Sequence, residues 1–205
     1  MLQPVDALRV VEEQRGNSVV VTTMMGSRMW RRISRNPGRD LHVGGAMGKA
    51  SSVAFGLAIA RPELKVIIVD GDGSILMNLG SLVSIANKAP ANLYHLVLEN
   101  GVYAMTGGQP IPGAGRFNIA GIAREAGYRA TYTFTDLKEF AAQASKVLNE
   151  RGPILVSLKV EAEIDNTPIH LRTPQARRTA DIMKDLREAL MHGVRSETSE
   201  FNAIE

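Results

Sequence analysis

The stretch Lys65-Val-Ile-Ile-Val-Asp-Gly-Asp-Gly-Ser74 decides the fold of this chain. Its apolar, β-branched half is typical of a buried strand, and residues 74–88 after it are predicted to be helical. Glycines in such a turn let the backbone approach a ligand closely, and the start of the helix offers unpaired N–H groups to a phosphate. Asp72 would repel a phosphate, and a divalent cation between the two would resolve the conflict. For this motif alone, a plain turn with a helix-capping Asp or Ser remains the alternative.

Asn100 is a second candidate ligand, at the end of the next predicted strand and 28 residues after Asp72. One strand–helix–strand unit spans about 30 residues, so adjacent parallel strands would bring both residues to the same sheet edge. The Asn side-chain carbonyl and a backbone carbonyl just beyond it would complete a set of hard oxygen ligands. Asn100-Gly101 alone is more often a turn. Together with Asp72, a metal site is the favoured interpretation.

Strands and helices alternate along the chain. Strands are predicted at residues 18–23, 41–43, 65–69, 92–98, 130–134 and 154–160, and helical or amphipathic segments at 5–14, 25–35, 50–60, 74–88, 119–126, 137–150 and 174–192. This order predicts an α/β fold of three layers, α/β/α, with a mostly parallel central sheet. Ligands bind beyond the carboxyl ends of such strands. The glycine-rich loops 44–48, 71–74 and 100–115 each follow a predicted strand, so we expect them to converge on one edge of the sheet.

Composition restricts the class of protein. The 205 residues suffice for one sizeable domain, predicted over 1–195 with a frayed tail at 196–205. A net charge of +3 gives no argument for nucleic acid, and the basic stretches 28–35 and 172–178 are interpreted as solvated or interface faces. The absence of cysteine excludes disulfides, thiolate zinc sites and iron–sulfur clusters. Without a leader or an apolar run long enough for a bilayer, we expect a cytoplasmic protein with no membrane contact.

The motifs resemble those of one known family. Gly71-Asp-Gly-Ser followed at this spacing by Asn100 resembles the motif that binds thiamine diphosphate (ThDP) in ThDP-dependent decarboxylases and their relatives. The resemblance covers about residues 15–165, and Gly44-Gly-Ala-Met-Gly48 resembles the segment that holds the aminopyrimidine ring of the cofactor. Three further stretches are most similar to the phosphonopyruvate and sulfopyruvate decarboxylase group: Gly45–Ser52, Asp72–Gly80 and Thr106-Gly-Gly-Gln-Pro. The resemblance therefore implies a ThDP-binding fold, with ThDP and Mg²⁺ as cofactors.

The resemblance also assigns roles around the diphosphate. Asp72 and the side chain of Asn100 would bind Mg²⁺, with the backbone carbonyl of Val102 as the third protein ligand. Gly73 and Ser74 would donate their backbone N–H groups to the diphosphate.

A further set of roles concerns the rings of the cofactor and the substrate. By the same resemblance, the Gly45 carbonyl and the Met47 N–H would bond the pyrimidine edge, and the Met47 side chain would lie as an apolar wedge beneath the two rings. Ordinary core packing is the alternative for Met47. Lys49, Thr106 and Gln109 are candidates for a substrate loop, although Lys49 departs from the pattern of the group and a solvated lysine or a simple loop is the alternative.

ThDP chemistry also needs a glutamate that protonates the pyrimidine ring. In the family this residue comes from a second, pyrimidine-binding type of domain, and no catalytic residue is assigned to this chain. The resemblance to β chains therefore implies an α-type partner subunit that carries the glutamate, a 2-oxoacid substrate, a homo- or hetero-oligomer and nonoxidative decarboxylation. The motifs leave open the identity of the 2-oxoacid and of the partner. They also leave open carboligation of the acetolactate synthase type, a 2-oxoacid oxidoreductase β subunit and a noncatalytic ThDP-binding subunit.

Overall fold

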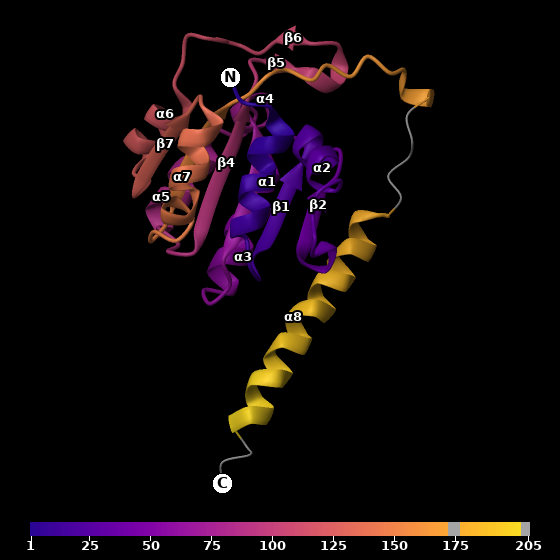
Figure 1. Cartoon of the computed structure of the whole chain (residues 1–205), viewed down its shortest axis with the longest axis vertical. Helices are drawn as coiled ribbons and strands as arrows, with labels where there is room; N and C mark the ends of the chain where they lie inside the picture. Colours follow the sequence, from indigo (N-terminus) through magenta and orange to yellow (C-terminus); the bar gives the residue numbers. More distant parts are fainter. Residues whose placement is uncertain (172–176, 202–205) are drawn as a thin grey trace.

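The computed structural model describes residues 1–171 and 177–201 of the chain, and within them it has three layers (Figure 1). The central sheet has six strands in the order β2-β1-β3-β4-β8-β7, and every pairing in it is parallel. The predicted three-layer fold with a mostly parallel sheet is confirmed. The strands of this sheet are β1 (Val19–Thr23), β2 (Asp40–Val43), β3 (Val66–Gly71), β4 (Leu93–Glu99), β7 (Ala130–Phe134) and β8 (Ile154–Lys159).

Helices cover both faces of the sheet because strand side chains alternate between the two faces. Val66 and Ile68 of β3 belong to one apolar core, whereas Ile67 and Val69 belong to the other. The first core contains residues of α3 (Ala50–Ala60), α4 (Asp72–Leu76), α5 (Gly80–Lys88), α6 (Ile119–Ala126) and α8 (Thr179–Phe201). The second contains residues of α1 (Pro4–Gln14), α2 (Met24–Trp30) and α7 (Leu137–Val147).

One predicted helix is wrong in detail. The segment expected to be one helix over 74–88 forms two, α4 and α5, with residues 77–79 between them. The helix is interrupted because of a tertiary contact: the Asn78 side chain donates to the Gly48 carbonyl (2.8 Å) and to the Ser52 hydroxyl (3.0 Å). Asn78 therefore ties this break to the glycine loop 44–48.

Two other segments also differ from the expected structure. The loop predicted over 100–115 contains a small antiparallel hairpin of β5 (Val102–Tyr103) and β6 (Gln109–Pro110), with the 3₁₀ turn η2 (Ala104–Thr106) between them. The helix predicted over 174–192 begins at Thr179, after the described but non-helical residues 177–178, and continues to Phe201; residues 172–176 lie outside the described residues. The expected frayed tail 196–205 thus overlaps α8, and residues 202–205 lie outside the described residues.

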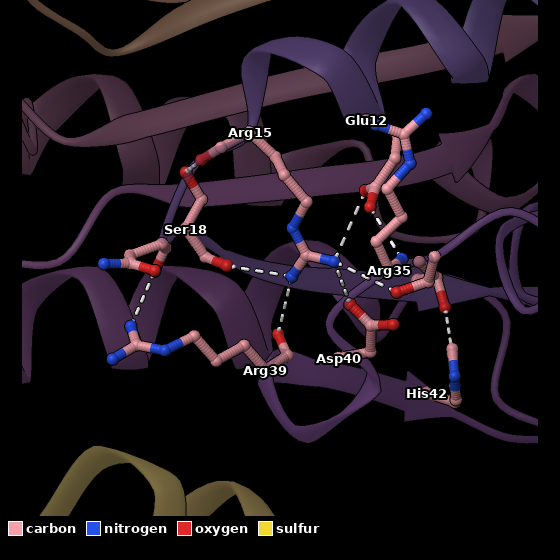
Figure 2. Close-up of polar contacts among 10 residues, drawn as sticks. Glu12, Arg15, Ser18, Arg35, Arg39, Asp40 and His42 are labelled. Atoms are coloured by element: carbon pink, nitrogen blue, oxygen red, sulfur yellow. Dashed lines mark hydrogen bonds and ion pairs between the residues drawn. The ribbon is translucent and has the colours of Figure 1, made fainter. Parts of the chain in front are cut away.

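A buried polar cluster anchors the amino ends of β1 and β2 (Figure 2). The Arg15 side chain, 3% exposed, lies 2.8 Å from the Asp40 carboxylate and 3.5 Å from that of Glu12. The guanidinium also lies 5.4 Å from the centre of the Trp30 ring. Its further hydrogen bonds go to the Ser18 carbonyl, the Ser34 hydroxyl and the Arg39 carbonyl. One cation therefore fixes α1, the end of α2 and the start of β2 relative to one another.

Candidate functional site

The loops after four neighbouring strands meet at the carboxyl edge of the sheet, where ligands bind in parallel α/β folds. A cavity that opens to solvent lies at this edge. The predicted convergence of the glycine loops is confirmed to the extent that Met47, Gly71–Ser74 and part of 100–106 line the same cavity. The remaining lining residues are Pro4, Thr23, Met24, Met25, Gly26, Met29, Asp70, Leu98, Val160 and Glu161.

Asp72 is a buried carboxylate, 2% exposed, at the floor of this cavity. One of its oxygens accepts the N–H of Gly73 (2.8 Å) and the other accepts the N–H of Gly101 (2.6 Å). Burial raises the pKa of Asp72, and the nearby Glu99 adds to the rise, while the hydrogen bonds from Gly101 and Gly73 oppose it. No Lys, Arg or His is among the described residues that line the cavity. A divalent cation would supply the missing positive charge.

Asn100 and Val102 lie in the wall beside Asp72, as the strand spacing predicts. β3 and β4 are adjacent, with Gly71 opposite Leu98, so the two strands end together. The Asn100 side-chain oxygen accepts the Val102 N–H (2.9 Å), which folds the chain into a tight turn. Among the described residues no cluster of three or more His, Cys, Asp and Glu could hold a metal. The candidate set instead combines one carboxylate with amide and backbone carbonyl oxygens, which suits a hard cation such as Mg²⁺.

Gly73 lies directly beneath an aromatic ring. A Cβ atom at this position would lie 2.6 and 2.9 Å from two ring carbons of Tyr103 and 3.1 Å from Ile111. The Tyr103 ring can lie this close to the backbone only because Gly73 has no side chain. Its N–H and that of Ser74 belong to the first turn of α4, and the Gly73 N–H donates to the Asp72 carboxylate.

Ser74 joins the two glycine loops. Its buried hydroxyl accepts the Gly48 N–H (2.9 Å), and the Asn78 amide described above takes the Gly48 carbonyl. On the other side, the Thr23 hydroxyl donates to the carbonyls of Val43 (3.2 Å) and Ala46 (3.4 Å). The loop after β2 is thus held from two neighbouring strands at once.

Only some of the residues predicted to contact the cofactor rings or the substrate lie at the cavity. Met47 is half-buried and lines the cavity, whereas Gly45, with a φ of +62°, is exposed beside it. Thr106 lines the cavity, and the Gln109 amide donates to the Thr106 carbonyl (2.7 Å). Gln109 itself and Lys49, at the start of α3, are exposed and are not among the lining residues. The structure therefore brings Met47 and Thr106 to the cavity and leaves Gly45, Lys49 and Gln109 outside its lining.

A wall of methionines was missed by sequence reasoning. Five of the nine methionines of the chain line this cavity: Met24, Met25, Met29, Met47 and Met105. Met24 has a φ of +49°, a left-handed conformation that is uncommon for any residue other than glycine. The available signal was that β1 also ends at this edge. Because the loop after β1 contains no glycine cluster, it resembled ordinary helical core.

The opening residues also reach this edge. Leu2 forms a parallel bridge with Val160, and the Gln3 amide donates to the Glu161 carboxylate (2.6 Å). Pro4 and Glu161 line the cavity. The start of the chain therefore contributes to the same wall as the segment after β8.

Comparison with known proteins identifies the type of domain. Residues 21–158 match the family described as thiamine pyrophosphate enzyme, C-terminal TPP binding domain, where TPP is another name for ThDP. The chain is 40% identical over 153 residues to a phosphonopyruvate decarboxylase of Streptomyces viridochromogenes, covering 74% of this chain and 37% of that protein. It is 32% identical over 170 residues to sulfopyruvate decarboxylase subunit beta of Methanothermobacter thermautotrophicus, covering 82% of this chain and 88% of that subunit.

The similarity to solved structures concerns the fold. A thiamine diphosphate-dependent 4-hydroxybenzoylformate decarboxylase of Rhodococcus jostii superposes with a TM-score of 0.63 at 20% identity, covering 81% of this chain and 33% of that one. The chain spans about a third of the length of the phosphonopyruvate decarboxylases that it matches. None of the described helices combines the length and the apolar character that a membrane span requires.

Proposed function

This chain belongs to the thiamine pyrophosphate enzymes, through their C-terminal TPP-binding domain, and from that premise we propose that it is the β-type subunit of a nonoxidative 2-oxoacid decarboxylase. The enzyme would depend on ThDP and Mg²⁺. The observation that carries the proposal is Asp72, a buried carboxylate that lies beside Asn100 and has no cation among the described lining residues.

The residues at the carboxyl edge suit both ends of the cofactor. Asp72, Asn100 and the Val102 carbonyl would hold Mg²⁺, and the N–H groups of Gly73 and Ser74 would receive the diphosphate. When bound, ThDP supplies the electron sink that a 2-oxoacid needs in order to lose CO₂.

The loop 44–48 would hold the aminopyrimidine through the Gly45 carbonyl and the Met47 N–H, with the Met47 side chain beneath the rings. Thr106, Lys49 and Gln109 remain our candidates for substrate contact. The methionine side chains that line the cavity would give an apolar wall that adapts to the shape of what it contacts.

The substrate class is proposed from the relatives and from the charges of the cavity. The relatives are named for phosphonopyruvate and sulfopyruvate, 2-oxoacids that carry a second acidic group. Such a group needs a cationic partner. Because no described lining residue is Lys, Arg or His, we expect that partner to come from another subunit or from residues beyond the cavity lining.

We propose that an α-type subunit completes the site and carries the activating glutamate. The match to a sulfopyruvate decarboxylase β subunit over 88% of its length supports an active site shared between two separate subunits. The apolar side chains of Val53, Ile59, Met77 and Val83, on α3 and on the α4–α5 segment, are exposed, and we expect a partner subunit to cover them.

The proposal is tested by thermal unfolding of the chain with Mg²⁺, ThDP or both. A ligand that binds only the folded state raises the melting temperature. We expect a rise that requires both, is lost in Asp72→Ala and persists in Asp6→Ala, which removes an exposed aspartate of α1. Release of CO₂ and of an equal amount of aldehyde from a 2-oxoacid should require the added α-type subunit.

Two outcomes would overturn the proposal. One is the absence of any Mg²⁺-dependent response to ThDP, both with the chain alone and with the α-type subunit present. The other is CO₂ release in which the product is a longer-chain 2-hydroxyketone rather than an aldehyde, because that product identifies a carboligase.

A further inference from the structure

The segment after β8 crosses the carboxyl edge of the sheet beside the β5–β6 hairpin (Figure 1). We call residues 160–168 the strap and residues 101–111 the hairpin. The Asp165 N–H donates to the Ala104 carbonyl at 2.8 Å. At Gly108, a Cβ atom would lie 2.6 Å from the end of the Ile164 side chain, so the strap packs tightly against the hairpin. The strap therefore supports the hairpin through one backbone hydrogen bond and one apolar contact.

The Asp165 side chain connects the strap to α2. The Asp165 carboxylate forms an ion pair with the guanidinium of Arg28, and its other oxygen accepts the Thr167 N–H (2.9 Å). The Asp165 side chain is 10% exposed and that of Arg28 39%. The hydrogen bonds from Thr167, and then the Arg28 guanidinium, hold the pKa of Asp165 well below its usual range, so the carboxylate stays charged. Arg28 lies in the basic stretch that the sequence suggested to be a solvated or interface face.

The hairpin itself contains little regular structure. Its two strands are two residues each, and so short a hairpin is not stable by itself. Gly101, Gly107 and Gly108 all have positive φ, a conformation that glycine adopts without steric cost, and they lie directly before β5 and directly before β6. Among the described contacts, the Gly101 N–H donates to Asp72, and Asp165 organises the hydrogen bond to Ala104. Tyr103 and Ile111 also pack against Gly73.

The position of the hairpin matters because it forms one wall of the cofactor cavity. It contributes the Val102 carbonyl, assigned above to the metal, and the Tyr103 ring that covers Gly73. Two further lining residues, Met25 and Met29, lie on the same helix as Arg28. One ion pair thus joins the strap beside the hairpin to a second element that lines the cavity.

We propose that Arg28 and Asp165 are positioning residues, whose ion pair locks the strap and the hairpin against α2 and thereby sets the affinity of the site for Mg²⁺ and ThDP. The locking acts through the Asp165 N–H and the Ala104 carbonyl, two residues from Val102. Neither side chain touches the cofactor or the substrate in this scheme. The effect on affinity rests on the proposed function, whereas the locking of the hairpin does not.

The first experiment measures hydrogen exchange of the peptide that covers residues 101–111 in the full chain without ligands. Arg28→Gln and Asp165→Asn should each speed exchange of these amides by about tenfold, the effect expected when a charged hydrogen bond is lost. The charge swap Arg28→Asp with Asp165→Arg should recover part of the protection. Arg124→Gln, which breaks the exposed pair with Glu125 on α6, is the matched control and should change nothing in the hairpin.

The second experiment titrates ThDP in the presence of Mg²⁺, with the buried Trp30 on α2 as the fluorescence reporter. Arg28→Gln should weaken the apparent affinity by about five- to tenfold, in keeping with the same lost contact, and the charge swap should restore part of it. If the wild-type chain alone shows no binding, the α-type subunit is added to every variant.

The outcomes separate this inference from the proposed function. Unchanged exchange in both single variants would overturn the inference whatever the cofactor does. Faster exchange with unchanged affinity would also overturn it, because the pair would then be merely structural. A wild-type chain that never binds ThDP overturns the proposed function and the affinity role together, while the exchange data still decide whether the pair locks the hairpin. If Asp165→Asn fails to fold, Arg28→Gln decides, because Arg28 is the more exposed partner.

Discussion

Replacement of Arg15 by methionine is the sharpest test of what holds this fold together (Figure 2). Methionine keeps much of the apolar length of the side chain and removes the guanidinium. The variant leaves the carboxylates of Glu12 and Asp40, 4% and 1% exposed, without their cation. It also leaves the Ser18 carbonyl without the donor that reaches it at 2.9 Å.

The size of the effect follows from this burial. Removing one partner of a buried ion pair costs about 3–5 kcal/mol, because the other charge stays buried and uncompensated. For a chain of 205 residues, each kcal/mol corresponds to about 2–4 °C in melting temperature. We therefore expect Arg15→Met to lower the melting temperature by about 6–20 °C. The double variant with Asp40→Asn should recover part of the loss, because one uncompensated charge is gone.

The assay is urea unfolding followed by circular dichroism, with thermal unfolding beside it. Arg9→Met is the matched control, because Arg9 is 64% exposed and pairs with an exposed Asp6. Exposed pairs contribute about 0–1 kcal/mol, so this control should stay close to the wild type. If Arg15→Met does not fold, Arg15→Lys replaces it, since lysine keeps the charge and loses the forked geometry. A loss for Arg15→Met that equals the loss for Arg9→Met would refute the reasoning.

Three further predictions concern the functional edge and its support. Gly73→Ala should lower the free energy of unfolding by about 1–3 kcal/mol, because the added methyl group would overpack against the Tyr103 ring. Urea unfolding measures this loss, and adding Tyr103→Ala to the same chain should relieve it. Equal stability of Gly73→Ala and the wild type would contradict the packing. Ser74→Ala should cost about 1–3 kcal/mol in the same measurement, because the buried Gly48 N–H loses its acceptor, and Ser84→Ala on the exposed face of α5 is the control. Burial, the largest influence, lowers the pKa of His42 from its ordinary 6.5, so the unfolded chain binds more protons and the free energy of unfolding should fall as pH drops below 6.5. His42→Gln should flatten that slope between about pH 5 and pH 8, and an unchanged slope would show that other groups cause it.

Most helices and strands could be predicted from the sequence because the patterns that specify them involve residues close together in the chain. The β-branched runs became the strands of the sheet, and α3, α6 and β7 have the bounds that their sequence patterns predict. The order of strands and helices then determined the parallel sheet and the edge at which Asp72 and Asn100 lie together. A spacing of 28 residues became a spatial contact because one strand–helix–strand unit separates the two.

The features that the sequence did not predict depend on contacts between distant parts of the chain. The break between α4 and α5 follows from the Asn78 side chain, whose acceptors lie 26 and 30 residues earlier. Strands of two residues, as in β5 and β6, are too short to show any periodicity. Met24 and its neighbours look like core in the sequence and lie at the cavity in the structure. Lys49 was a candidate on position alone, and position does not determine the direction of an exposed side chain.

The bridge between Leu2 and Val160 has a practical consequence for anyone who prepares this protein. It places the first residues beside the cavity wall, where Pro4 already contributes to the lining. A purification tag fused ahead of Met1 would emerge next to the opening through which a ligand enters, and its flexible residues would compete for that space. α8 leads the chain toward the opposite edge of the sheet (Figure 1). A tag fused after α8 therefore leaves the cavity mouth clear, and the two tagged forms should differ in how fast they take up a ligand.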